Sequence, residues 1–162
     1  MDRKERNRKI KKLNLPKWDQ IPNKGFYKFE LLKYLRPILS PLFINRENFI
    51  SSSMVNNYVK NGNIKEPVNK KYYRDSIAQL LAIIIFKKTL SIDEISKGTE
   101  IELKSFTISE LYDNFVEIFL DSKEKVLGDY KDLVKLEFKT KNHHDKFLYF
   151  WLYHYLQNFI KL

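Results

Sequence analysis

Apolar side chains recur at helical spacing along most of this chain. The clearest case is residues 77–86, where Gln79 is the only polar side chain, and such a segment is typical of a helix buried on nearly all sides. Residues 26–36 carry a second apolar pattern, which ends where Pro37 disfavours a continuing helix. Residues 108–119 carry a third apolar stripe. The pattern therefore predicts a mostly α fold.

Two Ser/Thr-x-x-Glu sequences predict where helices begin. Ser91 is followed three residues later by Glu94, and Thr107 is followed in the same way by Glu110. In a capping box, the hydroxyl and the carboxylate each accept a hydrogen bond from a free backbone N–H group at the start of a helix. We therefore expect one helix to start immediately after Ser91 and another after Thr107.

A shorter amphipathic helix is predicted near residues 52–61. Ser51 can accept a hydrogen bond from a free N–H group of the first turn. Val55 and Tyr58 lie three residues apart, so they share one apolar face. Gly62 offers the left-handed backbone conformation that commonly ends a helix.

The polar face of this helix and the segment near 68–74 carry groups that suit DNA. Asn reads adenine edges, Ser and Lys contact phosphates, and the N–H groups at a helix start favour phosphate. A capped surface helix followed by a basic loop without a ligand is the alternative interpretation of the same pattern. The predicted DNA-contacting residues are Ser52, Ser53, Asn56, Asn57, Lys60, Lys70, Lys71, Tyr72 and Arg74.

The charge distribution favours the DNA-binding interpretation. Residues 1–74 hold 18 Lys/Arg and 6 Asp/Glu, whereas residues 75–162 hold 12 Lys/Arg and 14 Asp/Glu, so the net charges are +12 and −2. All of the excess positive charge therefore lies in the half that contains the predicted reading helix. A one-sided basic region is the electrostatic signature of nucleic-acid binding.

The central sequence resembles a known family. Ser-Met-Val-Asn-Asn-Tyr-Val-Lys-Asn-Gly-Asn-Ile-Lys-Glu-Pro-Val-Asn-Lys-Lys-Tyr, at residues 53–72, is similar to the core of an uncharacterised bacterial family catalogued as domain of unknown function 1836. The resemblance continues through Ile-Ala-Gln-Leu-Leu at 77–81 and Leu-Ser-Ile-Asp-Glu-Ile at 90–95. It covers most of residues 13–97 and does not extend to the C-terminal third.

That family is in turn similar to the winged helix-turn-helix of the mercury-resistance-regulator (MerR) type. The similarity implies a reading helix at 52–61 with Ser53, Asn56 and Asn57 toward DNA, and a wing at 68–74 with Lys70 and Tyr72 in the places of the MerR wing arginine and tyrosine. The chain departs from the pattern, because Asn56 and Asn57 replace the usual Arg and Tyr of the reading helix. The type of operator and the MerR activation mechanism are therefore not implied.

Three parts are expected along the chain. Residues 1–14 hold seven Lys/Arg and two Asp/Glu, and they predict a basic flexible arm that either lies along DNA phosphates or serves as a solubilising tail. Residues 15–100 are expected to form the MerR-like winged helix-turn-helix domain. Residues 101–162 are expected to form a C-terminal helical region.

The C-terminal region allows three interpretations, because residues 147–156 are dense in aromatic side chains. They complete a core, form the interface of a homodimer, or enclose a small apolar effector. Dimerisation is common among helix-turn-helix readers, which bind symmetric half-sites. The sequence does not decide between these possibilities.

Several classes of protein are disfavoured by composition. The chain has no Cys, and its four Gly do not form a phosphate-binding fingerprint. His143, His144 and His154 lack the spacing of a metal site. No triad or carboxylate pair suggests catalysis. We therefore expect no enzyme activity, cofactor or metal, and the lack of a long apolar run or a signal peptide predicts a cytoplasmic protein without a membrane span.

The sequence thus predicts a mostly α, winged helix-turn-helix protein of MerR-like type with additional C-terminal helices. Its expected function is to bind double-stranded DNA and regulate transcription in a bacterial cytoplasm. Two alternatives stay open: a protein-interaction module that kept the winged-helix shape, and an effector-sensing repressor with an aromatic C-terminal pocket. The sequence does not identify the operator, the effector, the oligomeric state or the direction of regulation.

Overall fold

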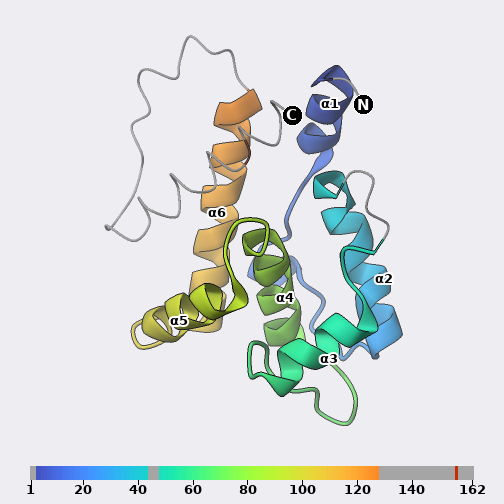
Figure 1. Ribbon diagram of the computed structural model, residues 1–162, viewed down its shortest axis with the longest axis vertical. Helices are drawn as coiled ribbons and strands as arrows, with labels where there is room; N and C mark the ends of the chain where they lie inside the picture. The colour runs from blue at the N-terminus through green and yellow to red at the C-terminus, as the bar shows by residue number, and fades with distance from the viewer. Residues whose placement is uncertain (1–2, 44–47, 128–155, 157–162) are drawn as a thin grey trace. The chain divides into compact units, whose positions relative to one another are not determined.

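Helices dominate the residues that this computed structural model describes, which are 3–43, 48–127 and 156 (Figure 1). Within those residues the only β pairing is two isolated bridges. The prediction of a mostly α fold is therefore confirmed. The helices are α1 (Arg3–Lys12), η1 (Trp18–Gln20), α2 (Lys28–Leu39), η2 (Ser40–Leu42), α3 (Ser52–Lys60), α4 (Arg74–Phe86), α5 (Ile92–Glu102) and α6 (Ile108–Leu127), of which η1 and η2 are 3-10 helices.

The chain forms two compact units. One is the continuous segment Pro16–Asp113, and the other combines Met1–Leu15 with Asn114–Leu162. The main unit therefore begins close to the expected position and ends 13 residues later than residue 100. The C-terminal aromatic residues 147–155 lie outside the described residues.

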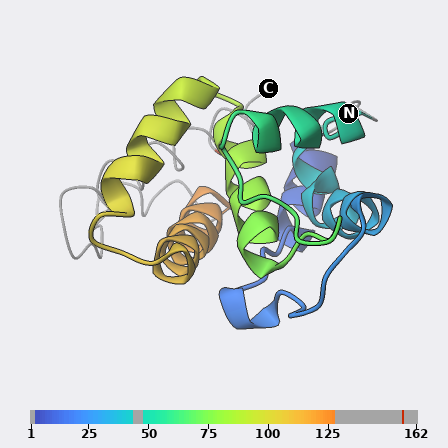
Figure 2. The same ribbon diagram turned by 90° about the horizontal axis from the view of Figure 1, so that it is seen from below.

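Helix α4 is the centre of the Pro16–Asp113 unit, as its nearly unbroken apolar sequence predicts. Ile77, Leu80, Leu81 and Ile85 are completely buried, and most of the other α4 side chains are also buried. Helices α2 and α5 both contact α4, and α3 contacts α2 (Figure 1). Seen from below, α3 runs crosswise to α4 (Figure 2). Burial of each such Ile or Leu contributes about 2 kcal/mol, so α4 organises this unit.

Helix α2 extends beyond the end that the sequence predicts. Pro37 lies inside α2, which continues to Leu39. Proline removes one backbone hydrogen bond and disfavours a helical conformation at the residue before it. Leu35 and Leu39 are completely buried on either side of Pro37. Their burial offsets this local cost, and the chain then passes directly into η2.

The two predicted capping boxes are confirmed. In each, the backbone N–H of the Ser or Thr donates to the Glu carboxylate at 2.8 Å, and the Glu N–H donates back to the hydroxyl at 3.3 Å. Helices α5 and α6 start directly after Ser91 and Thr107. These hydrogen bonds favour the ionised carboxylate and lower the pKa of both Glu94 and Glu110.

The second unit differs from the expected flexible arm, because residues 3–12 form helix α1. Ile10 and Leu13 are completely buried, and these two side chains give the basic segment an apolar anchor. The Nζ of Lys123 on α6 donates to the backbone carbonyl of Leu13 at 2.8 Å. Net charge alone suggested an arm in solvent, whereas the packing of two apolar residues accounts for an ordered helix.

A short antiparallel bridge joins segments far apart in the sequence of the Pro16–Asp113 unit. The backbone of Phe26 exchanges two hydrogen bonds with that of Tyr72, at 2.8 and 2.9 Å. Beside the bridge, a Cβ atom built on Gly25 would lie 2.8 Å from the Cβ and Cδ atoms of Lys71 and 3.0 Å from the Tyr73 ring. The side chains of Lys71 and Tyr73 therefore pack so closely over position 25 that a Cβ atom there would force them to shift.

We expect Gly25→Ala to destabilise the protein by about 1–3 kcal/mol, the usual cost of overpacking. Its extra carbon would meet the Lys71 Cβ, which is fixed to the backbone, as well as atoms further along the Lys71 and Tyr73 side chains. Urea unfolding of the variant and of the parent would measure the difference. Gly98→Ala is the matched control, because a Cβ at Gly98 meets no atom within 4 Å. Equal losses for the two variants would contradict the close approach.

We also expect stability to fall as the pH drops through the lowered pKa values of Glu94 and Glu110. Their ordinary value is 4.5, so the contribution of the ionised carboxylates is fully present above that value and is lost as they become protonated in the folded state. Urea midpoints between pH 6 and pH 3 would measure this loss. The double substitution Glu94→Gln and Glu110→Gln should flatten the profile below pH 4.5, and an unchanged profile would contradict this assignment.

Candidate nucleic-acid interface

Helix α3 forms where the sequence predicts it. The hydroxyl of Ser51, which has an extended backbone (φ −129°, ψ 164°), accepts a hydrogen bond from the Met54 N–H at 3.3 Å. At the other end, Gly62 has φ 69° and its N–H donates to the carbonyl of Val59 at 3.0 Å. The predicted cap and stop signals at Ser51 and Gly62 are both confirmed.

The two faces of α3 have different surroundings. Val55 is completely buried and Tyr58 is 5% exposed, so both are core residues. The five residues that were predicted to contact DNA from this helix are all exposed: Ser52, Ser53, Asn56, Asn57 and Lys60. The helix therefore presents two hydroxyls, two amides and one ammonium group to solvent. Its opposite face, with Val55 and Tyr58, packs into the core.

Three interactions of Lys65 anchor the chain that follows α3 to the first turns of α4. Its N–H donates to Gln79 Oε1 at 2.8 Å, its carbonyl accepts from Ser76 Oγ at 2.9 Å, and its Nζ lies 2.6 Å from Asp75 Oδ2. Ile64, one residue earlier, is 2% exposed. The loop thus has a defined path from α3 to the predicted wing.

Residues 68–71 form a tight hairpin turn. The backbones of Val68 and Lys71 exchange two hydrogen bonds, at 2.9 and 3.0 Å. The two central residues, Asn69 and Lys70, have φ values of 49° and 65°. Positive φ at both central positions is the signature of a type I′ turn. The residues predicted to form a wing are therefore a minimal hairpin turn, and the described part of the chain does not show the extended strands of a full wing here.

Lys70 occupies the tip of this hairpin and is exposed. Lys71 is half-buried, and its Nζ lies 5.1 Å from the centre of the Tyr27 ring, where a cation is attracted to the aromatic face. Of the two wing lysines, Lys70 thus has the more open position, whereas the stem of Lys71 packs over Gly25.

Two predicted phosphate contacts are placed differently from the expectation. Tyr72 is only 3% exposed, and burial raises the pKa of its hydroxyl. Arg74 donates from Nε to the carbonyl of Ile21 at 2.9 Å, and its guanidinium also lies 3.8 Å from Asp19 and 5.7 Å from the centre of the Trp18 ring. We therefore correct both assignments: Tyr72 is part of the core, and Arg74 fastens the segment around η1 to the start of α4.

The structure adds Lys28 to the candidate site. Lys28 is the first residue of α2, and its Nζ donates a hydrogen bond to Asn56 Oδ1 on α3. The start of α2 is stabilised by Glu30, whose carboxylate accepts a hydrogen bond from the Tyr27 N–H at 2.9 Å, while the Tyr27 side chain itself makes no cap. That spacing is visible in the sequence, but no local pattern shows that residues 28 and 56 meet.

A hollow of about 460 Å³ lies between the start of α2, the outer face of α3 and the hairpin. Its apolar lining comes from aromatic, valine and proline side chains, and its polar groups are three lysines and one amide. The residues that line it are Tyr27, Lys28, Asn56, Val59, Lys60, Pro67, Lys70 and Tyr72. Four of the predicted contact residues, Asn56, Lys60, Lys70 and Tyr72, are thereby brought together around one concave surface.

The described residues hold no group of three or more His, Cys, Asp or Glu side chains placed to bind a metal ion. The three His residues of the sequence lie outside that part of the chain. No helix in the described part is both long and apolar enough to cross a membrane.

Comparison with known proteins gives one match. The family described as Domain of unknown function (DUF1836) matches residues 16–115, a range that almost coincides with the compact unit Pro16–Asp113. No curated protein and no solved structure matches the chain. The resemblance inferred from residues 53–72 is confirmed by this match, and the chain belongs to the DUF1836 family.

Proposed function

We propose that the protein binds double-stranded DNA, with the exposed face of α3 in the major groove and the 68–71 hairpin beside the phosphate backbone. The observation that carries the proposal is the placement of Ser52, Ser53, Asn56 and Asn57 on one exposed helix face. These side chains match the chemistry of groove recognition, and a capped helix is a rigid support for them.

Charge around this face supports the same proposal. Lys28, Lys60 and Lys70 all line the hollow beside α3, and they come from three separate segments of the chain. The start of α3 carries free N–H groups and a partial positive charge that favour phosphate. Phosphates along a bound duplex would therefore meet the lysines around the hollow at the C-terminal half of α3 and, separately, the N–H groups at the start of that helix.

The contact between Lys28 and Asn56 has a consequence for base readout. An Asn that reads adenine donates from its amide nitrogen and accepts through its oxygen. Lys28 donates to the Asn56 side-chain oxygen. This hydrogen bond fixes the orientation of the Asn56 amide, with its nitrogen pointing away from the Lys28 ammonium group. We propose that Lys28 holds Asn56 in this orientation in the free protein and contacts a phosphate in the complex.

Winged helix-turn-helix architecture and MerR-type transcriptional regulation are the finer parts of this proposal. The order of α2, α3, the hairpin and α4 fits such a domain, and the hairpin stands where a wing is needed. Homodimerisation, a bacterial cytoplasmic location, and the lack of catalytic activity, cofactor and metal belong to the same proposal. The interaction-module alternative predicts the opposite result in a DNA-binding test, because its basic face would meet an acidic protein.

We expect Asn56→Ala to weaken binding to a specific site by about 5- to 150-fold, the range for one bidentate base contact, and to change binding to random duplex much less. Sites selected from a random duplex pool would supply the specific sequence, and fluorescence anisotropy would measure both affinities. Asn14→Ala is the control, since Asn14 is an exposed asparagine outside α3. Equal losses on specific and random DNA would remove Asn56 from base readout.

We expect Lys60→Ala to weaken binding to all duplexes and to lower the slope of log affinity against log salt by about 1, because one phosphate contact is lost. A salt series with random duplex DNA measures this slope. The control is Lys104→Ala, which removes an exposed lysine after α5. No duplex binding by the parent protein at low salt would contradict the proposed function as a whole.

The substitution Lys70→Gly at the hairpin tip distinguishes an effect on stability from an effect on DNA binding. A non-glycine residue in the left-handed conformation costs about 1–2 kcal/mol, and the greater unfolded-state freedom of glycine offsets about 0.5–1 kcal/mol of that strain. We therefore expect unchanged or slightly higher stability by urea unfolding, together with weaker duplex binding. A stable variant with unchanged DNA affinity would show that the tip does not contact phosphate.

A further inference from the structure

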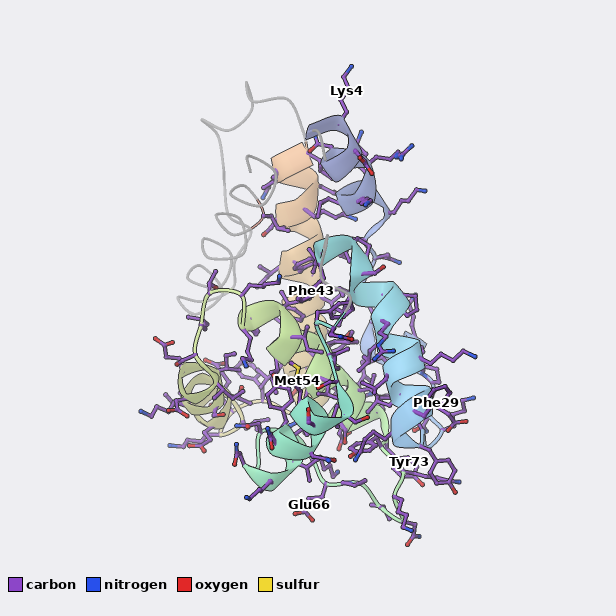
Figure 3. The ribbon with its side chains drawn as sticks, turned by 45° about the vertical axis from the view of Figure 1, so that its right-hand side comes forward. Lys4, Phe29, Phe43, Met54, Glu66 and Tyr73 are labelled. Atoms are coloured by element: carbon purple, nitrogen blue, oxygen red, sulfur yellow. The ribbon has the colours of Figure 1, made fainter. Side chains whose placement is uncertain are left out.

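A group of exposed apolar side chains lies beside the proposed duplex-binding face. Tyr27, Phe29, Val68 and Tyr73 are 51%, 77%, 56% and 42% exposed, and we call these four residues the aromatic patch. They come from the start of α2 and from the hairpin and its continuation into α4. Figure 3 shows Phe29 and Tyr73 at the same end of the Pro16–Asp113 unit, both directed toward solvent.

Backbone contacts hold the two parts of the patch together. The Phe26–Tyr72 bridge joins the segment before α2 to the segment after the hairpin. A Cβ atom on Gly25 would lie 3.0 Å from the Tyr73 ring, so this ring covers the backbone just before Tyr27. The bridge therefore brings the segments of Tyr27 and Tyr73 together, although these residues are 46 positions apart in sequence, and Phe29 follows Tyr27 at the start of α2.

Lysines surround this patch. The Nζ of Lys71 lies 5.1 Å from the centre of the Tyr27 ring, and the Nζ of Lys24 lies at the same distance from the Phe26 ring. Lys28 and Lys70 stand on its border with the hollow. The neighbouring carboxylate of Glu30 accepts the Tyr27 N–H. The other acidic residues of these two segments are Glu66 and Asp75, and Asp75 is paired with Lys65. Positive charge is thus in excess around the exposed rings.

Single exposed apolar residues are ordinary, but a contiguous group usually marks a binding surface. The lysines disfavour a purely apolar protein partner here. Aromatic faces with adjacent cations are the arrangement on which unpaired nucleobases stack while lysines contact the phosphates. Duplex DNA does not offer its base faces, so this surface has a chemistry distinct from that of the α3 face.

We propose that the aromatic patch binds single-stranded nucleic acid, with bases stacked on Phe29 and Tyr73 and phosphates held by Lys24 and Lys71. Each base would contribute its π face rather than its hydrogen-bonding edge, so binding is independent of sequence. The patch and the α3 face meet at the hollow, which allows an unpaired strand to continue from a duplex held on α3. This second activity goes beyond the proposed duplex binding and does not depend on it.

The test uses the full chain and a labelled oligothymidine of about 12 nucleotides, within the size range of known single-strand sites. Fluorescence anisotropy at low salt gives the affinity for the parent protein. We expect Phe29→Ala and Tyr73→Ala each to weaken binding by about 5- to 150-fold, the range for loss of one stacked base. Phe106→Ala, which removes another exposed ring (40% exposed), should leave the affinity unchanged.

Two further variants distinguish stacking from other contacts. Phe29→Trp should retain oligothymidine binding, whereas Phe29→Leu keeps an apolar side chain without a π face and should lose it. Phe29 is mostly in solvent, so these variants should fold like the parent, which thermal unfolding would verify. Equal binding by Phe29→Leu and the parent would overturn the proposal, as would a lack of oligothymidine binding.

Random duplex DNA, measured in parallel, separates this inference from the proposed function. Phe29→Ala should leave duplex affinity unchanged, and Asn56→Ala should leave oligothymidine affinity unchanged. Oligothymidine binding without duplex binding would contradict the proposed function and support the single-strand site. A change in sedimentation mass on Phe29→Ala, with unaltered oligothymidine affinity, would instead assign the patch to association of two copies and overturn the proposal.

Discussion

Burial of α4 is the constraint on which the rest of the Pro16–Asp113 unit depends. Ile77, Leu80, Leu81 and Ile85 lose all contact with solvent, and α2 and α5 pack against the helix that carries them. The polar atoms at the start of α4 then hold the chain that leaves α3, through the backbone and side chain of Lys65. The apolar helix and its polar first turns therefore determine where the hairpin stands.

The candidate site is assembled from segments that are distant in sequence. The Phe26–Tyr72 bridge brings the start of α2 to the hairpin, and the Lys28–Asn56 hydrogen bond brings it to α3. A backbone ladder of one residue pair and one side-chain contact are small interactions individually. They are effective here because the core beneath α2, α3 and α4 already limits the freedom of all three elements.

Positive charge in the sequence is not equivalent to positive charge offered to a ligand. Arg74 binds the Ile21 carbonyl and lies over Trp18, and Lys65 is paired with Asp75. Lys60 and Lys70, by contrast, are exposed around the hollow. The basic half of the chain therefore divides its cations between holding loops in place and presenting a surface, and only the second group is expected to produce a salt-dependent affinity for nucleic acid.

The residues matched by the family and the residues of one compact unit are almost the same. Residues 16–115 belong to the family, and the unit that contains α3, the hairpin and the aromatic patch is Pro16–Asp113. Both the proposed duplex site and the proposed single-strand site thus lie within the part of the chain that defines the family. The α1 segment, whose charge suggested an arm, belongs to the other unit.

Local signals in the sequence determined much of the secondary structure. Ser51 and Gly62 set the ends of α3, the Ser91 and Thr107 boxes set two helix starts, and the apolar run after residue 76 predicted a buried helix. These features are readable because a cap, a left-handed glycine or a continuous apolar face depends on residues within one or two turns. The exposed face of α3 followed directly from that periodicity.

Tertiary structure decided which polar groups are available and which meet. The burial of Tyr72, the engagement of Arg74 and the contact between Lys28 and Asn56 all depend on long-range packing. The continuation of α2 through Pro37 has the same origin, since buried leucines on both sides offset an unfavourable local conformation. A sequence pattern records which side chain is present, but its accessibility and its partners are set only when distant segments pack together.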